Sequence, residues 1–233
     1  MPKSLESRSN IEEAYRGIKR LMLAQKLVPG QRLPYRELTE LLGMSKTPII
    51  NALNRLEQEG FILSEPNVGY AVKPISEKEI TDSYEVREAL EVKALQKAIE
   101  SGTAGQLAAL EEKYRTFDQY RPSRCDRKKM MLDCEFHLQM AVMSGNEVLR
   151  YLLRRNFEHI ILRTRLDNYV WVKWENSIND LGDLMEKIKA RNFPSGAEIL
   201  IRHIRDARDN VLSSIRGEDQ EGMDTASLFE FGT

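Results

Sequence analysis

The stretch LPYRELTELLGMSKTPIINALNRLEQEGFILSEPNVGYAV, from Leu33 to Val72, decides how this chain folds. It begins with a short amphipathic run that Gly43 interrupts. A second run then repeats apolar residues every three or four positions, as one face of a helix does. Ser45 stands just before this second run, where a hydroxyl can accept a backbone N–H of the first turn, and Gly60 ends it. Two helices joined by a glycine-containing turn predict a helix-turn-helix.

Two β-prone runs follow directly, at 61–63 and 70–72. Between them stand three residues that favour turns: Pro66, Asn67 and Gly69. This pattern predicts a hairpin after the second helix, with a further short strand at 31–33 that pairs with it. A helix-turn-helix followed by such a hairpin is a winged helix.

The motif SKTPIINALNRLEQEGFI, which starts at Ser45, resembles the recognition helix of GntR-family transcription regulators. LPYRELTELLGMS, which starts at Leu33, resembles the helix before it. Later residues are similar to the FadR-type branch, which carries an all-helical FCD ligand-sensing domain. Together the resemblances run from about Asn10 to about Ser214. They imply an effector-responsive, sequence-specific DNA-binding regulator, most of whose relatives are repressors released by a small molecule.

The rest of the chain indicates helices only. After the hinge at 73–76, helical runs are predicted from Ser76 to Ser101 and at 104–119, 123–144, 147–167, 172–191 and 195–215. We therefore predict a mainly α protein with a winged helix-turn-helix domain at 1–75 and an antiparallel helical bundle at 76–217. The polar tail at 218–233 lacks periodicity and is expected to be disordered.

Charge and cysteine content narrow the class of protein. Residues 1–75 carry 11 Lys/Arg and 8 Asp/Glu, whereas the remainder carries 24 and 28, so a slightly basic head precedes an acidic body. The basic run from Arg124 to Lys129 is expected to be a solvated helix start. Two cysteines, Cys125 and Cys134, fit a reducing cytoplasm, and no apolar run is long enough to span a membrane.

The tip of the second helix is the predicted DNA-reading element. Residues near the N-terminus of a helix in the major groove contact base edges and phosphates, and Ser45, Lys46 and Thr47 occupy that place. By resemblance, Arg36 and Lys46 match DNA-contacting arginines of the family. In the wing, Gly69 matches a family glycine that lets the backbone approach the minor groove, and Asn67 and Tyr70 are further candidates.

One departure from the family pattern affects the predicted operator. The family usually has an arginine where this chain has Ile50, and a glutamate where it has Asn51. An isoleucine offers only apolar contact, for instance to a thymine methyl group, so Asn51 or Asn54 would have to satisfy that face. We expect a double-stranded operator whose sequence differs from those of relatives.

A candidate metal site lies in the C-terminal half. Asp133 and His137 are four residues apart on one predicted helix and share a face, and His203 lies on the last helix. FCD domains of the metal-binding type have these ligands and another histidine, whose expected position holds Leu181. Three readings stay open: a divalent metal such as Zn²⁺ on three ligands, a metal-free organic-ligand pocket, or satisfied core residues.

Three arginines are candidate effector ligands. Arg87 resembles a family arginine that faces the effector cavity, where a guanidinium would hold a carboxylate through two hydrogen bonds. The alternative is a pair with Glu91, four residues along the same helix. Arg163 and Arg165 are further candidates for binding the carboxylated effector.

A homodimer is expected, because a pseudo-palindromic operator needs two recognition helices at a fixed separation.

Two alternative classes of function are retained beside the regulator. A metal-dependent enzyme on the helical bundle is one alternative, although no nucleophile or general base accompanies the Asp and His residues. A winged-helix module that binds proteins rather than DNA is the other.

Overall fold

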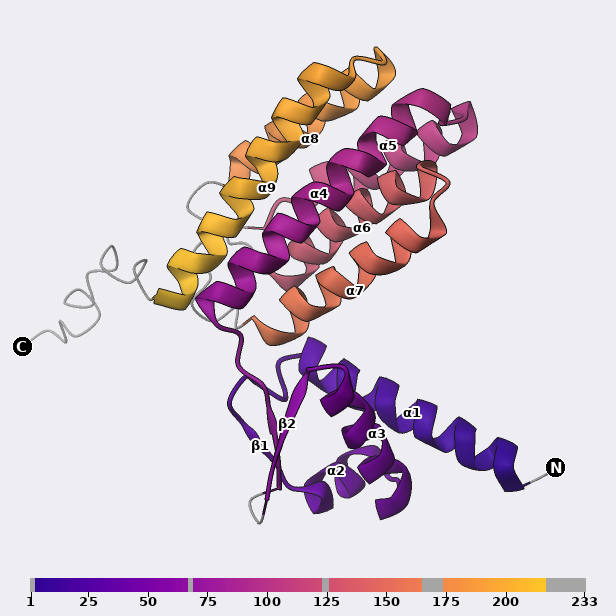
Figure 1. Cartoon of the computed structure of the whole chain (residues 1–233), viewed down its shortest axis with the longest axis vertical. Coiled ribbons are helices and arrows are strands. Elements are labelled where there is room, and N and C mark those ends of the chain that lie inside the picture. Colours follow the sequence, from indigo (N-terminus) through magenta and orange to yellow (C-terminus); the bar gives the residue numbers. More distant parts are fainter. Residues whose placement is uncertain (1–2, 67–68, 123–125, 165–173, 217–233) are drawn as a thin grey trace, which may run out of the picture. The chain divides into compact units, whose positions relative to one another are not determined.

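The structure, a computed structural model, describes residues 3–66, 69–122, 126–164 and 174–216 (Figure 1). It divides into two units, one formed by residues 1–76 together with 158–165, and the other by residues 77–157 together with 166–233. Asn67, Arg124, Cys125, Arg165 and the tail at 218–233, all named above, lie outside the described residues.

The first unit contains the predicted helix-turn-helix. Its three N-terminal helices are α1 (Lys3–Leu23), α2 (Tyr35–Leu42) and α3 (Lys46–Gln58). The apolar positions of α3 that recur at helical spacing point inward and are buried with those of α1. These buried positions of α3 are Ile49, Ala52, Leu53 and Leu56. Burial of one stripe leaves the opposite face of α3 to solvent, as the periodicity predicts.

The wing is a three-stranded antiparallel sheet. Its strands are β1 (Arg32–Leu33), β2 (Ile62–Glu65) and β3 (Gly69–Val72), in the spatial order β1-β3-β2. In the register Leu33 pairs with Tyr70, and Ile62 pairs with Val72. Leu33, Ile62 and Val72 are buried, so the sheet closes over the core of the three helices. The strand predicted beside the wing is confirmed.

The two glycines that end α2 and α3 adopt the left-handed conformation. Gly43 has φ of 64° and Gly60 has φ of 78°, a region that other residues enter at a cost. Ser45 occupies the N-cap of α3 with extended backbone, but its side chain makes no capping hydrogen bond. The capping role predicted for its hydroxyl is therefore wrong, and the exposed hydroxyl is available to other partners.

The second unit is a helical bundle, as predicted. In Figure 1 its helices lie side by side with their long axes roughly aligned. Residues 158–163 at the end of α7 are grouped with the first unit. In the part of the chain that the structure describes, no helix is both long and apolar enough to cross a membrane. The helices are α4 (Glu77–Ser101), α5 (Ala104–Gln119), α6 (Arg127–Met143), α7 (Glu147–Arg163), α8 (Trp174–Lys189) and α9 (Phe193–Arg216).

One residue of the basic run, Lys129 in the first turn of α6, departs from expectation. Lys129 is fully buried rather than solvated. Its ammonium group donates hydrogen bonds to the carbonyls of Phe117 and Tyr120 and lies 3.5 Å from the Phe117 ring centroid. Carbonyls at a helix C-terminus have no partner within the helix, so a cation that reaches them stabilises the end of α5.

Candidate DNA-binding surface and buried ligand site

The N-terminus of α3 projects a polar tip. Ser45, Lys46 and Thr47 are exposed, whereas Pro48 and Ile49 behind them are buried against the first unit's core. The core therefore anchors the helix while the three polar side chains face outward. This is the arrangement that a helix entering the major groove requires.

The face of α3 that departs from the family pattern is also accessible. Asn51 is exposed and Ile50 is half-buried. Asn54, one turn further along, accepts a 2.6 Å hydrogen bond from the Tyr70 hydroxyl. This bond ties β3 to α3 and occupies the carbonyl oxygen of Asn54, so its amide nitrogen is the atom that can donate to a base.

Two more residues predicted to contact DNA flank this tip. Arg36 is exposed in the first turn of α2. Gly69 is exposed at the start of β3 with φ of 102°, a conformation that suits glycine. The sequence reasoning did not include Tyr35, whose ring centroid lies 4.5 Å from the Lys46 ammonium.

The predicted metal ligands converge in the second unit. Asp133 and His137 on α6 and His203 on α9 are all buried. The Nε2 atoms of the two histidines lie 3.2 Å apart. The Asp133 Oδ1 atom lies 3.3 Å from the His203 Nε2 atom and 3.6 Å from the His137 Nε2 atom. α6 and α9 both pack against α4, and this arrangement joins residues 66 positions apart in the sequence.

These distances fit a divalent metal ion. A point equidistant from the corners of a triangle with sides of 3.2, 3.3 and 3.6 Å lies about 2 Å from each. Zinc bonds to His nitrogen and carboxylate oxygen span about 2.0–2.2 Å. The Asp133 Oδ1 atom is buried and makes no hydrogen bond, as a ligand oxygen would. The three residues therefore form a plausible ligand set for such an ion.

A fourth residue, Glu91 on α4, completes the surroundings of His137. Its Oε2 atom lies 2.5 Å from the His137 Nδ1 atom, and both side chains are fully buried. A carboxylate at Nδ1 favours the tautomer that presents the Nε2 lone pair, and outer carboxylates commonly orient metal-binding histidines in this way. From sequence spacing Glu91 is expected only as a partner of Arg87, because nothing local indicates its contact with His137.

Arg87 is buried against the same cluster. Its Nε atom lies 2.5 Å from the Glu91 Oε1 atom, and its Nη2 atom lies 3.7 Å from the Asp133 Oδ2 atom. The pair with Glu91 considered above therefore forms. The Nη2 atom is buried and makes no hydrogen bond. The rings of Tyr84 and Phe157 lie 5.4 and 4.8 Å from the guanidinium carbon and exclude water.

Neighbouring ionisable groups shift the pKa values of Asp133 and His137 more than burial does. Burial raises the pKa of Asp133, but the neighbouring His137 and His203 hold that pKa well below its ordinary value. Burial lowers the pKa of His137, but the carboxylates of Glu91 and Asp133 raise it above its ordinary value overall. The cluster is thus a compact set of ionisable groups that shift one another's pKa values inside the bundle.

Leu181, which occupies the position where a further histidine ligand was expected, lies in the core. Leu181 on α8 is fully buried. Its neighbour Asp180 pairs with Arg202, the neighbour of His203, through Oδ1 and Nη2 atoms 2.5 Å apart. This pair places Leu181 and His203 at the same level of the α8–α9 hairpin, and the position where a histidine was expected carries a buried apolar side chain. Asp183, the other acidic residue nearby, is exposed.

Arg163 has backbone partners. It belongs to the first unit, where its Nε and Nη2 atoms donate to the carbonyls of Lys73 and Pro74 at 3.3 and 2.7 Å. These bonds hold the hinge segment. Of the three arginines proposed as effector ligands, Arg87 is the one that the structure brings to the buried cluster within the described residues.

Comparisons with known proteins agree with this organisation. The model for bacterial regulatory proteins of the gntR family matches residues 10–72, and the FCD domain model matches residues 82–206. The Nta operon transcriptional regulator of Aminobacter aminovorans is 29% identical over 193 residues, which cover 81% of this chain and 88% of that protein.

Solved structures show the same fold. McbR/YncC of Escherichia coli aligns with a TM-score of 0.75 and 20% identity over 88% of this chain and 98% of that chain. A GntR-family transcriptional regulator from Pseudomonas syringae aligns with a TM-score of 0.54 and 23% identity over 96% and 92%. The predicted two-part architecture is thereby confirmed.

Proposed function

The chain belongs to the GntR family of bacterial regulatory proteins and carries an FCD domain, and on this premise we propose that it is a repressor released by a small carboxylated metabolite. It is a DNA-binding transcriptional regulator and not an enzyme, in agreement with its relatives. The winged helix implies operator DNA as one partner, and the FCD domain implies a small-molecule effector as the other. The sign of regulation and the chemistry of the effector are our proposals.

The buried cluster of the second unit is the observation that carries the proposal. A core that served stability alone would not favour two histidines, two carboxylates and an arginine at one place. Replacing buried ion pairs with apolar residues is often neutral or stabilising. Two atoms of this cluster are buried without a hydrogen bond, Arg87 Nη2 and Asp133 Oδ1. The Glu91 Oε2 and His137 Nδ1 atoms pair with each other at 2.5 Å.

We further propose that Asp133, His137 and His203 hold one divalent metal ion. Their donor atoms lie within 4.8 Å of one another and match the preferences of zinc or a similar ion. With three protein ligands and Leu181 in place of a fourth, an ion there would supply an open position that attracts carboxylate oxygens. Glu91 keeps the His137 ring oriented.

Arg87 is our candidate for the second contact of the effector. Its Nη2 atom is buried 3.7 Å from Asp133 and makes no hydrogen bond. A guanidinium that lacks a partner for one nitrogen is suited to bind a carboxylate oxygen. This geometry supports an acidic effector over a neutral or cationic one.

A homodimer is proposed from the surface of α7. Val148, Tyr151 and Leu152 are 69%, 61% and 47% exposed, and their spacing of three and four residues places them on one face. Exposed apolar side chains grouped on one helix mark an interaction surface. A second copy of the chain would cover both faces at once and present two winged heads to a two-fold operator.

The decisive experiment tests whether an effector that binds the FCD domain changes the affinity of the winged helix for its operator. A duplex selected by the protein from a random pool serves as the operator. Its affinity is measured while a panel of mono-, di- and tricarboxylates is titrated, with and without Zn²⁺. We expect at least one carboxylate to weaken binding in wild type and to have no effect in Arg87→Met. Operator affinity that no carboxylate alters would refute the coupling, since only ligands that distinguish two states shift them.

A further inference from the structure

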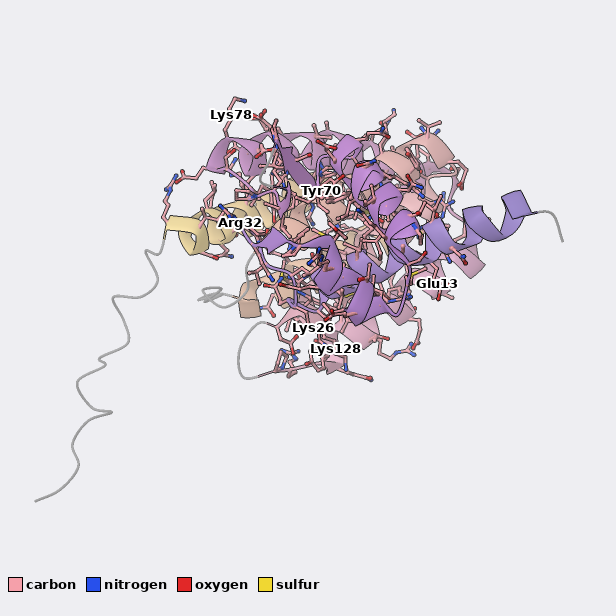
Figure 2. All side chains as sticks on the ribbon, turned by 90° about the horizontal axis from the view of Figure 1, so that it is seen from below. Glu13, Lys26, Arg32, Tyr70, Lys78 and Lys128 are labelled. Carbon is pink, nitrogen blue, oxygen red and sulfur yellow. The ribbon has the colours of Figure 1, made fainter. Side chains whose placement is uncertain are left out.

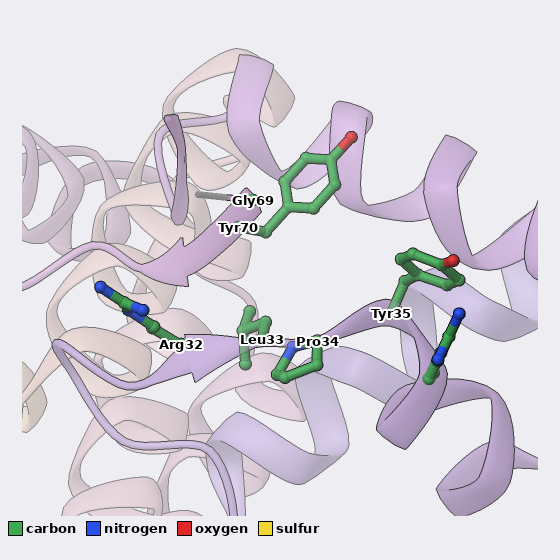
Figure 3. Close-up of a pocket in the computed structure, with 7 residues that line it drawn as sticks. Arg32, Leu33, Pro34, Tyr35, Gly69 and Tyr70 are labelled. Carbon is green, nitrogen blue, oxygen red and sulfur yellow. The ribbon is translucent and has the colours of Figure 1, made fainter. Parts of the chain in front are cut away.

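A groove opens beside the recognition helix of the first unit. Its volume is about 470 Å³, and it lies between the segment 32–36 and the start of β3. In Figure 3, Leu33 and Pro34 lie between Arg32 at one end and Tyr35 at the other, with Tyr70 across from them. The lining residues are Arg32, Leu33, Pro34, Tyr35, Arg36, Gly69 and Tyr70.

The charge of the groove is positive. Arg32 and Arg36 are exposed, and none of the seven lining residues is acidic. Lys46 adds a third cation next to the groove, because its ammonium lies 4.5 Å from the Tyr35 ring centroid. Three cations around one concave surface attract a polyanion and hold it by charge-assisted hydrogen bonds.

Tyr35 organises two of these cations. The cationic side chains of Arg36 and Lys46 hold the pKa of the Tyr35 phenol below its ordinary value. The ring also offers Lys46 a cation–π contact. Tyr35 therefore contacts Lys46 at the tip of α3, and its hydroxyl lies near positive groups where an anionic oxygen would also be stabilised.

The groove is held in a fixed relation to α3. The Tyr70 hydroxyl on its wall donates a 2.6 Å hydrogen bond to Asn54 of α3. Leu33, on its floor, is buried and pairs with Tyr70 in the sheet. Whatever occupies the groove is thus positioned relative to the residues that face the bases.

We propose that this groove binds the sugar-phosphate backbone of the operator next to the bases that α3 reads, with Arg32 and Tyr35 as phosphate contacts. The inference rests on the DNA-binding function and adds a site to it. Arginine and tyrosine side chains both commonly bind DNA phosphates, and such contacts set register and orientation without reading sequence. Arg32 and Tyr35 therefore supply affinity, whereas Ile50 and Asn51 supply base preference.

The test uses the full chain and a mixed-sequence duplex of about 30 base pairs over a range of salt concentrations. Each phosphate contact made by a cation contributes about 0.9 to the slope of log K against log salt. We expect Arg32→Gln to reduce the slope by about that amount, and Arg32→Lys to keep it. Tyr35→Phe keeps the ring, and we expect it to weaken binding about fivefold at one salt concentration.

The matched control is Lys26→Gln. Lys26 is an exposed cation of the same unit that does not line the groove, and it lies apart from Arg32 and Tyr70 in the view of Figure 2. We expect this variant to keep the wild-type slope. Base preferences from a random-pool selection should be unchanged in Arg32→Gln and Tyr35→Phe.

The possible outcomes distinguish a failure of the proposed groove contacts from a failure of the DNA-binding function itself. If wild type binds the duplex but Arg32→Gln and Lys26→Gln have equal slopes, the groove does not hold a phosphate. A shift in base preference in Arg32→Gln would show that the groove reads bases instead. If wild type ignores every duplex at low salt, the DNA-binding function itself fails.

Discussion

Removing the Glu91 side chain tests whether the buried cluster is the charged network described above. Glu91→Ala leaves the Arg87 guanidinium buried and facing Asp133 at 3.7 Å, after losing a carboxylate at 2.5 Å. It also takes from His137 the carboxylate oxygen at 2.5 Å. Breaking a buried pair by deleting one partner costs about 3–5 kcal/mol, because a charge stays desolvated without compensation.

The matched control lies one turn earlier on the same helix. Glu88 pairs with Arg205 at 2.9 Å, but these side chains are 28% and 55% exposed. Solvent screens such a pair, so Glu88→Ala should cost about 0–1 kcal/mol. In a unit of this size each kcal/mol moves the melting temperature by about 2–4 °C. Glu91→Ala should therefore melt about 10 °C below wild type, and Glu88→Ala within about 4 °C of it.

Urea and thermal unfolding followed by circular dichroism supply the measurement. If the two variants differ by less than about 1 kcal/mol, Glu91 does not carry the buried network and the reasoning is wrong. The double variant Arg87→Met with Glu91→Leu removes both charges together. We expect it to regain most of the lost stability while losing the response to carboxylates, since apolar replacement of a whole pair is often neutral.

Three other predictions follow from the same structure. Ile50→Arg should change the base preference in a random-pool selection, because a guanidinium can read guanine where isoleucine cannot; an unaltered preference would show that this position does not face the bases. Leu181→His should increase the rise in melting temperature that Zn²⁺ produces, while His203→Ala should abolish it; equal shifts in all three proteins would place the ion elsewhere. In a Cys125→Ser background, Cys134 should resist iodoacetamide until the chain unfolds, because burial raises the pKa of its thiol well above the ordinary value; rapid alkylation of the folded protein would contradict its burial.

The winged helix could be predicted from the sequence because its signals are local. Apolar residues at helical spacing, Gly43 and Gly60 at helix ends, and turn residues between two β-prone runs all act over a few positions. The structure confirms each of these elements. The hydroxyl of Ser45 is an exception: the residue type matched a capping position, but whether its side chain bonds to the backbone depends on a rotamer that residue type does not determine.

The candidate ligand site could be predicted only in part. Asp133 and His137 share a helix face by spacing alone, and the resemblance to FCD domains added His203. The contact of Glu91 with His137 joins α4 to α6 across 46 positions, and nothing local indicates it. The burial of Lys129 was missed for a similar reason, since its partners are carbonyls at the end of another helix.

The sequence by itself determined the order and type of the elements and the residues at the tip of α3, because helix periodicity and turn chemistry operate between near neighbours. Tertiary structure alone decided which buried charges of different helices meet. The placing of Glu91 against His137, and of Leu181 level with His203, follows from how whole helices pack. Helix packing is driven by burial of apolar surface summed over many residues, so the partner of any one polar side chain is a consequence of the whole bundle.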